Sequence, residues 1–436
     1  MPNFRPWSMA LAAVFACLPI GCQFNWFAPT TPLREGLNPI EVRDVDGEAD
    51  ARNGLDKFDL FERSEQLRLA SKPDVLPPVK NILCLSGGGS YGAYTAGVLV
   101  GWTQSGIRPK FDVVTGVSTG ALIAPFAFLG SDYDSVLKTY YTTIRDRDVF
   151  RPRRTVRTIL LATDSFADSS PMAKKIEAVI TAELLEKIAA EHAAGRRLYV
   201  ATTELESRRE VIWDLGAIAS AGKPGDLELF RNILLASSAI PGFFPPVSIP
   251  ITVDGVPMQE SHVDGSLNHA IYFRAPHVPA ELRGESGAGG LYGSNVYVIV
   301  AGKLYPDPDR VKLRSLTIAA NSVSTVLYSL ARGDLARLYS TCVVTGMNYN
   351  LAAVPAAQRV DFSPTQFDPE DMTALFESGV AWSTGGASWR STPPGLEPGE
   401  GFFLRTTTDL KLDTIGLPPV NERPRLLIPR ASVRQN

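Results

Sequence analysis

The sequence predicts an α/β fold of three layers, α/β/α, with a largely parallel central sheet. Short apolar runs typical of strands alternate with helical segments, and two strand–turn–helix units follow each other directly. Parallel strands joined by helices form sheets that are covered on both faces. The 436 residues are 44% hydrophobic and 20% charged, so the chain can bury a core without a disulfide framework.

The N-terminal segment predicts export. Arg5 precedes an apolar run from Trp7 to Ile20, which is typical of a signal peptide and short for a bilayer span. The run ends in LPIGC, which resembles a bacterial lipoprotein signal with Cys22 as the lipidated first residue, although Pro19 replaces the usual Leu. This resemblance implies a chain secreted across the inner membrane and lipid-anchored in the cell envelope. The alternative is an ordinary secretory signal cut nearby.

Composition divides the rest of the chain. Residues 23–78 are polar and rich in proline, as in a spacer, and the tail at 386–436 turns to Pro, Gly and scattered charge. The folded domain is therefore predicted over 79–385, with no later stretch apolar enough to cross a membrane. The 43 Lys and Arg nearly balance the 46 Asp and Glu, which argues against a nucleic-acid binder.

The elements of this domain follow in order from their periodicity. A strand at 80–86, a glycine turn and a helix at 91–104 form the first unit, and a strand at 111–115, a turn at 116–120 and a helix at 121–129 form the second. Beyond them we expect a helix at 172–192, strands at 198–203 and 210–215, a helix at 230–239, a strand at 295–302, one or two helices within 316–344, and a last helix at 368–380.

The second turn, Gly116-Val117-Ser118-Thr119-Gly120, matches Gly-x-Ser-x-Gly between a strand and a helix. That context suits a nucleophile elbow, in which flanking glycines allow a strained turn to present the Ser118 hydroxyl. By itself the pattern is common by chance. Its position after a strand makes Ser118 the candidate nucleophile.

The first turn holds Gly87, Gly88 and Gly89, whose backbone N–H groups would face an anion at the start of a helix. The run also satisfies Gly-x-Gly-x-x-Gly, a dinucleotide signature that requires an acidic residue at the end of the second strand. Asp112 stands at the beginning of that strand, and the strand's end leads to Ser118. We therefore interpret the three glycines as an oxyanion hole facing Ser118.

A serine nucleophile needs a base. Of the four histidines, His192 and His277 are expected at the surface, in a charged helix and a Pro-flanked loop. In His262-Val263-Asp264-Gly265-Ser266 an acid precedes glycine at a strand end, so Asp264 is either the base itself or the group that orients a histidine.

SGGGSYGA, GVSTG and HVDGS, in this order, resemble the patatin-like phospholipase family, and the similarity covers residues 80–349, including Ala236 to Pro241. The resemblance implies Ser118 as nucleophile, Asp264 as base of a Ser-Asp dyad, and Gly87, Gly88 and Gly89 as oxyanion donors. Two positions depart from the family pattern, because Tyr91 replaces a basic residue and Ser266 replaces a second glycine after the acid. Substrate preference is the property these changes affect.

The expected activity is hydrolysis of acyl esters of lipids, with a lipid or phospholipid substrate at a membrane surface and no cofactor. No His, Cys or carboxylate cluster has metal-ligand spacing, and Cys84 and Cys342 are expected in the core. Four arginines within FRPRRTVR, starting at Arg151, indicate either a solvated loop or a patch that attracts headgroups. The alternatives are a Ser-His-Asp esterase, which needs His269 or His277 after the acid, and a non-catalytic envelope lipoprotein.

Overall fold

The structure is a computed structural model that describes residues 40–43, 79–152, 165–253, 256–273, 291–306, 315–386, 388–397 and 400. Residues Met1–Pro393 form one compact unit and Pro394–Asn436 a second, and all elements below belong to the first. The expected signal peptide with Cys22, most of the spacer, His277 and the tail beyond 400 lie outside the described residues.

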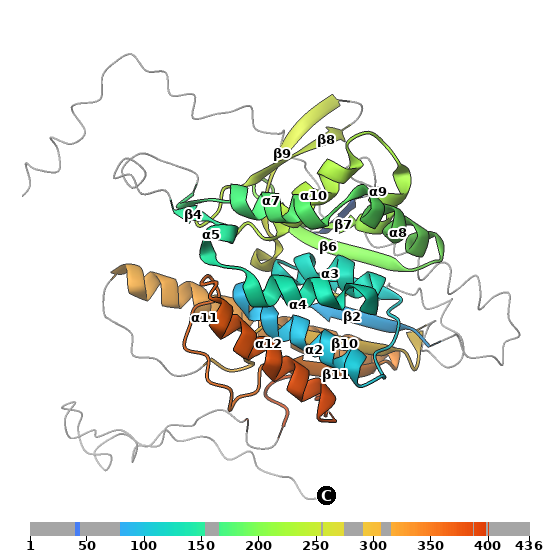
Figure 1. Cartoon of the computed structure of the whole chain (residues 1–436), viewed down its shortest axis with the longest axis vertical. Coiled ribbons are helices and arrows are strands. Elements are labelled where there is room, and N and C mark those ends of the chain that lie inside the picture. The colour runs from blue at the N-terminus through green and yellow to red at the C-terminus, as the bar shows by residue number, and fades with distance from the viewer. Residues whose placement is uncertain are drawn as a thin grey trace, which may run out of the picture. The chain divides into compact units, whose positions relative to one another are not determined.

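A mixed sheet of nine strands forms the centre of the described part of the chain (Figure 1). Strands β6, β3, β2, β10 and β11 are parallel neighbours, β7 and β9 pair antiparallel with β6, β8 pairs with β9, and β1 pairs parallel with β7. Their bounds are β1 Ile40–Arg43, β2 Asn81–Leu85, β3 Val113–Gly116, β6 Arg197–Glu204, β7 Arg209–Asp214, β8 Val247–Val253, β9 Val256–Asp264, β10 Asn295–Val300 and β11 Asn348–Ala353. The predicted three-layer, mostly parallel fold is confirmed.

Helices cover both faces of this sheet. They are α2 Gly92–Gln104, α3 Thr119–Leu129, α4 Asp134–Thr143, α5 Asp146–Val149, α7 Ser170–Val179, α8 Ala182–Ala193, α9 Leu215–Ala221, α10 Asp226–Ser237, α11 Ser315–Thr345 and α12 Pro369–Thr384. Side chains alternate along β2, so Leu83 and Leu85 pack with α2, α3 and α12, whereas Ile82 and Cys84 pack with α11. Cys84 and Cys342 are both buried and free, as expected.

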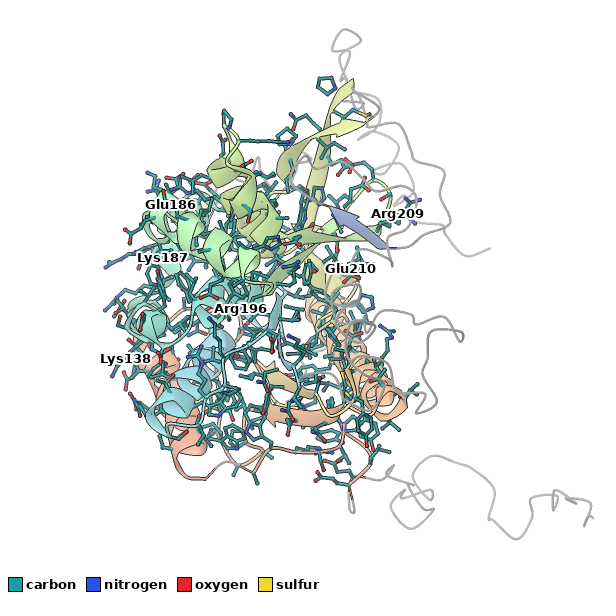
Figure 2. All side chains as sticks on the ribbon, turned by 90° about the vertical axis from the view of Figure 1, so that its right-hand side faces the viewer. Lys138, Glu186, Lys187, Arg196, Arg209 and Glu210 are labelled. Carbon is teal, nitrogen blue, oxygen red and sulfur yellow. The ribbon has the colours of Figure 1, made fainter. Side chains whose placement is uncertain are left out.

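A buried cation joins the layers at the start of the parallel strands. Arg196, just before β6, donates hydrogen bonds to the carbonyl oxygens of Phe111 and Phe128 and pairs with Glu191 at 2.9 Å. Figure 2 shows Arg196 directed into the domain, whereas Lys187 on α8 lies at the surface. The guanidinium therefore satisfies the carbonyl groups where α3 ends and β3 approaches.

Several expectations are wrong in detail. The helix expected at 172–192 is two helices, α7 and α8, because Thr181 caps α8 by accepting a hydrogen bond from the Leu184 N–H group. The segment 316–344, expected to hold one or two helices, forms a single helix of 31 residues, in agreement with that expectation. His192 is half-buried beside Gly216 rather than at the surface. Helix α4, strand β8, most of strand β9 and strand β11 form where no element was expected.

Ordered packing continues past α12. Trp389 contacts Trp102 and Tyr297 with ring centroids 4.7 and 5.2 Å apart, and Arg390 pairs with Leu351 of β11. The side chains that follow the last helix thus help to cover the sheet. The predicted domain boundaries stay predictions.

The sheet places two predicted site residues side by side. Strand β3 pairs with β6 only as far as Gly116, opposite Val200. Two residues further along β6, Thr202 faces Asp264, the last residue of β9. The chain that leaves β3 turns away at Ser118, and β9 takes its place beside β6, so Ser118 and Asp264 meet at the end of β3.

Candidate active site

Ser118 occupies a strained turn between β3 and α3. Its backbone has φ 53° and ψ −123°, a region that few residues other than glycine adopt. The turn also requires a close approach, since a Cβ on Gly120 would lie 2.4 Å from the carbonyl oxygen of Leu85. The flanking glycine thus lets the elbow pack against β2, with Ser118 at the N-terminus of α3.

The end of α10 holds this turn in place, a role that no sequence motif predicts. The Ser237 hydroxyl accepts a hydrogen bond from the Ser118 N–H group at 3.0 Å and donates one to Ala201 of β6 at 2.7 Å. Two residues on, the Ala239 carbonyl accepts from the Asp264 N–H group at 2.9 Å. The segment that contains both residues therefore fixes the backbone of Ser118 and of Asp264 together.

Asp264 is buried, with 4% of its surface exposed. Burial raises the pKa of its carboxyl group from 3.8 to about 6, although hydrogen bonds from the Ser118 hydroxyl and from the backbone and side chain of Ser266 act to lower it. The Ser266 N–H group lies 2.8 Å from Asp264 Oδ1. A carboxylate beside a serine hydroxyl, still ionised at neutral pH, can accept the proton of that hydroxyl.

The glycine loop lies against the same serine. A Cβ on Gly87 would stand 3.2 Å from Ser118 Cβ and 2.4 Å from Ser266 Oγ, so only glycine fits between them. Gly88 and Gly89 have φ 156° and 55°, and a Cβ there would lie 2.1 Å and 2.0 Å from the carbonyl oxygens of Ala301 and Pro364. Substitution at any of the three would displace the loop.

The three glycine N–H groups differ in what they contact. Gly87 donates to the Ala270 carbonyl at 3.2 Å. Within the described residues, the N–H groups of Gly88 and Gly89 have no recorded acceptor. The Tyr91 hydroxyl donates to the Phe362 carbonyl, so the tyrosine that replaces a basic residue ties the loop to the segment before α12.

His262 is engaged in a buried chain of hydrogen bonds. Trp213 Nε1 donates to Thr202 Oγ1 at 2.8 Å, and that hydroxyl lies 2.9 Å from His262 Nδ1. His262 Nε2 lies 3.0 Å from Glu260 Oε2. Both ring nitrogens are thus occupied away from Ser118.

The other described histidines contact different groups. His269 Nδ1 lies 3.0 Å from Glu210 Oε1, and His269 Nε2 lies 3.9 Å from Asp334 Oδ1. His192 Nδ1 lies 3.8 Å from Asp214. No contact of a histidine with Ser118 is recorded in the part of the chain that the structure describes. Arg151 is exposed, and the other arginines of FRPRRTVR lie outside that part.

A largely apolar cavity reaches Ser118. It encloses about 980 Å³ of empty space, part of which is open to solvent. Aliphatic and aromatic side chains of α3, α4, α7 and α10 form most of its wall, among them Leu122, Phe126, Val136, Ile176 and Leu234. An apolar cavity that opens on the serine suits a hydrocarbon chain with one end at Ser118. The residues that line this cavity come from separate elements, so no sequence motif predicts them.

Comparison with known proteins agrees with the motifs. Residues 83–275 match the model of the family described as patatin-like phospholipase. No curated protein sequence matches the chain.

The described residues include no group of His, Cys, Asp and Glu that could hold a metal ion, and none of their helices is long and apolar enough to cross a membrane.

Two solved structures match parts of this chain with low TM-scores. VipD from Legionella pneumophila is 12% identical, with 71% of this chain and 66% of that chain covered and a TM-score of 0.33. The ExoU–SpcU complex from the type III secretion system of Pseudomonas aeruginosa is 16% identical, with 71% and 51% covered and a TM-score of 0.26. The matched region spans about half to two thirds of these chains. Residues 83–275 of this chain are thus similar to the patatin-like phospholipase family.

Proposed function

We propose that this chain is a serine acyl hydrolase that cleaves carboxylic esters of lipids with a Ser118–Asp264 dyad. A patatin-like phospholipase domain is a lipid hydrolase at the level of its family. The observation that supports the dyad is the strained Ser118 next to the buried carboxyl group of Asp264, in the wall of an apolar cavity.

The proposed reaction begins when Ser118 Oγ attacks the ester carbonyl carbon and its proton passes to Asp264. The carbonyl oxygen becomes an oxyanion that the N–H groups of Gly88 and Gly89 stabilise; each such donor contributes about 2.7 to 4 kcal/mol in comparable sites. Collapse of this intermediate breaks the ester bond, and the alcohol leaves with the proton from Asp264. Water then repeats the sequence on the acyl-serine and releases the fatty acid.

Existing hydrogen bonds limit which backbone N–H groups near Ser118 can bind the oxyanion. Gly87 shares its N–H group with Ala270, and Ser118 shares its own with Ser237, so neither N–H group is available to an oxyanion without breaking a bond. Gly88 and Gly89 remain as donors, and Gly87 serves to let the loop approach Ser118. A fixed pair of backbone donors needs no rearrangement during the reaction.

The Ser-His-Asp triad is the second candidate. It would require a histidine at the serine, and the contacts of His262 and His269 with Glu260, Thr202, Glu210 and Asp334 weigh against it. His262 instead has a structural part within β9, where it contacts the buried Glu260.

The deciding experiment compares the wild type with Ser118→Ala. A fluorophosphonate should label Ser118 in the wild type, and Ser118→Ala should lose both labelling and hydrolysis of a p-nitrophenyl ester. Ser248→Ala serves as the control, because it removes an exposed hydroxyl on β8 that contacts Gln259, and this variant should still be labelled. Hydrolysis by Ser118→Ala at a rate close to that of the wild type would overturn the assignment.

A further inference from the structure

The N-terminal half of α11 is an apolar helix that the rest of the described structure leaves uncovered. Every residue from Asn321 to Leu327 is exposed, including Val323 at 60% and Val326 at 65%. In Figure 1 this half extends outward from the body of the domain, at the left of the view. Buried contacts begin only in the second half, where Leu335 and Leu338 enter the core.

The exposed half carries no charge. From Ser315 to Ala331 the sequence has no Asp, Glu, Lys, Arg or His. At a 100° turn per residue, Val323, Val326 and Leu330 share one face, and Ser322 and Thr325 lie on another. The hydroxyls of these two residues donate to Ile318 and Asn321 carbonyls at 2.9 and 2.8 Å. They therefore need little water when the helix enters a less polar medium.

The anchored end of α11 is connected to the candidate active site. Asp334 is buried, and its Oδ2 accepts a hydrogen bond from the Ala270 N–H group at 2.8 Å. The Ala270 carbonyl in turn accepts from Gly87 of the glycine loop. At the other end of this segment, Ala301 lies against Gly88. The chain between Ala301 and Asp334 thus leaves from the glycine loop and returns to it.

We propose that the face of α11 formed by Val323, Val326 and Leu330 inserts into the surface of a lipid bilayer and holds the active site there. This inference rests on the proposed lipid hydrolysis, because a bilayer is where such a substrate lies. Because this half carries no charge, its binding to a bilayer would come from buried apolar area and would not depend on anionic lipid.

A local probe tests insertion without requiring turnover. With Cys17 and Cys22 replaced by Ser, the remaining Cys84 and Cys342 are buried, so a new cysteine can be labelled selectively with a polarity-sensitive fluorophore. The full chain carries the label either through Val323→Cys or, as the matched control on the polar face, through Thr325→Cys. Phosphatidylcholine vesicles carry no net charge and serve as the probe.

Insertion predicts a blue shift on vesicles for the label at 323, with quenching by brominated acyl chains, and a much smaller response for the label at 325. No response at 323, or equal responses at both positions, overturns the proposal. A shift at 323 that grows with protein concentration in the absence of vesicles indicates association of two copies through this face and overturns it as well.

A second comparison links the surface to catalysis. Val323→Asp/Val326→Asp should weaken vesicle binding of the helix by about tenfold for each valine, about 100-fold together, whereas Ser324→Asp/Thr325→Asp adds the same charge away from that face and should change it far less. Both variants should hydrolyse a soluble short-chain ester like the wild type. Equal loss of vesicle hydrolysis in both variants overturns the proposal. Failure of the wild type on the soluble ester would instead refute the proposed function, and the fluorescence result would stand.

Discussion

Asp264→Asn should abolish hydrolysis and at the same time stabilise the domain near neutral pH. Burial raises the pKa of Asp264 from 3.8 to about 6. The folded state therefore binds this proton more tightly than the unfolded chain does, and the free energy of unfolding falls as pH rises from about 4 to about 6. A difference of about two pKa units between the folded and the unfolded chain lowers the free energy of unfolding by about 3 kcal/mol at pH 7.

Asparagine has the shape of the protonated acid and carries no charge, so it removes this cost. Its Oδ1 can still accept the Ser266 N–H group, while the altered hydrogen bond with Ser118 costs about 1 kcal/mol. The expected net gain is about 2 kcal/mol near neutral pH. At about pH 4 the wild-type carboxyl is protonated in the fold, so the gain should disappear.

Urea unfolding of both proteins near neutral pH and at about pH 4 measures this gain, because contributions from other titrating groups are common to both and cancel. Asp112→Asn is the matched control: Asp112 is partly exposed and pairs with Lys80 at 3.2 Å, so its loss should cost at most about 1 kcal/mol. An Asp264→Asn protein less stable than the wild type near neutral pH, or a difference independent of pH, would refute the reasoning.

Four further predictions follow from the same contacts. The kcat/KM of a soluble ester should fall about tenfold per pH unit below about pH 6, because protonated Asp264 cannot accept the Ser118 proton; a profile flat to about pH 4 would contradict this. Leu122→Trp should fill the cavity and lower kcat/KM for long-chain esters at least about tenfold relative to short ones, so an unchanged chain-length profile counts against the cavity. His262→Gln should lose about 2 to 4 kcal/mol of stability through Glu260 yet keep most activity of the folded protein, and a variant as inactive as Asp264→Asn would favour the triad. Expressed in a bacterium fed labelled palmitate, the wild type should carry the label and Cys22→Ser should not; an unlabelled wild type with a cleaved N-terminus indicates a secretory signal only.

Local sequence signals predicted the parts of the fold that depend on local chemistry. The two strand–turn–helix units at Asn81 and Val113 were placed within about two residues, because apolar runs and glycine turns leave a strong pattern. The single helix expected at 172–192 was wrong, since its apolar periodicity runs through Thr181 without a break. A capping threonine inside an amphipathic pattern looks like any exposed helical residue until the Leu184 N–H group is seen to bond to it.

The site shows the same division between local and distant causes. Gly88 and Gly89 could be picked out because a run of glycines is rare and their backbone angles require it. The partners of Ser118 could not be predicted from spacing, since Ser237 and Asp264 are 119 and 146 residues away along the chain. They meet it because β3 ends at Gly116 while β6 continues, which leaves an edge that β9 fills in the opposite direction. The position of Asp264 is thus set by the unequal lengths of two neighbouring strands, a property of the pairing that neither strand's sequence carries alone.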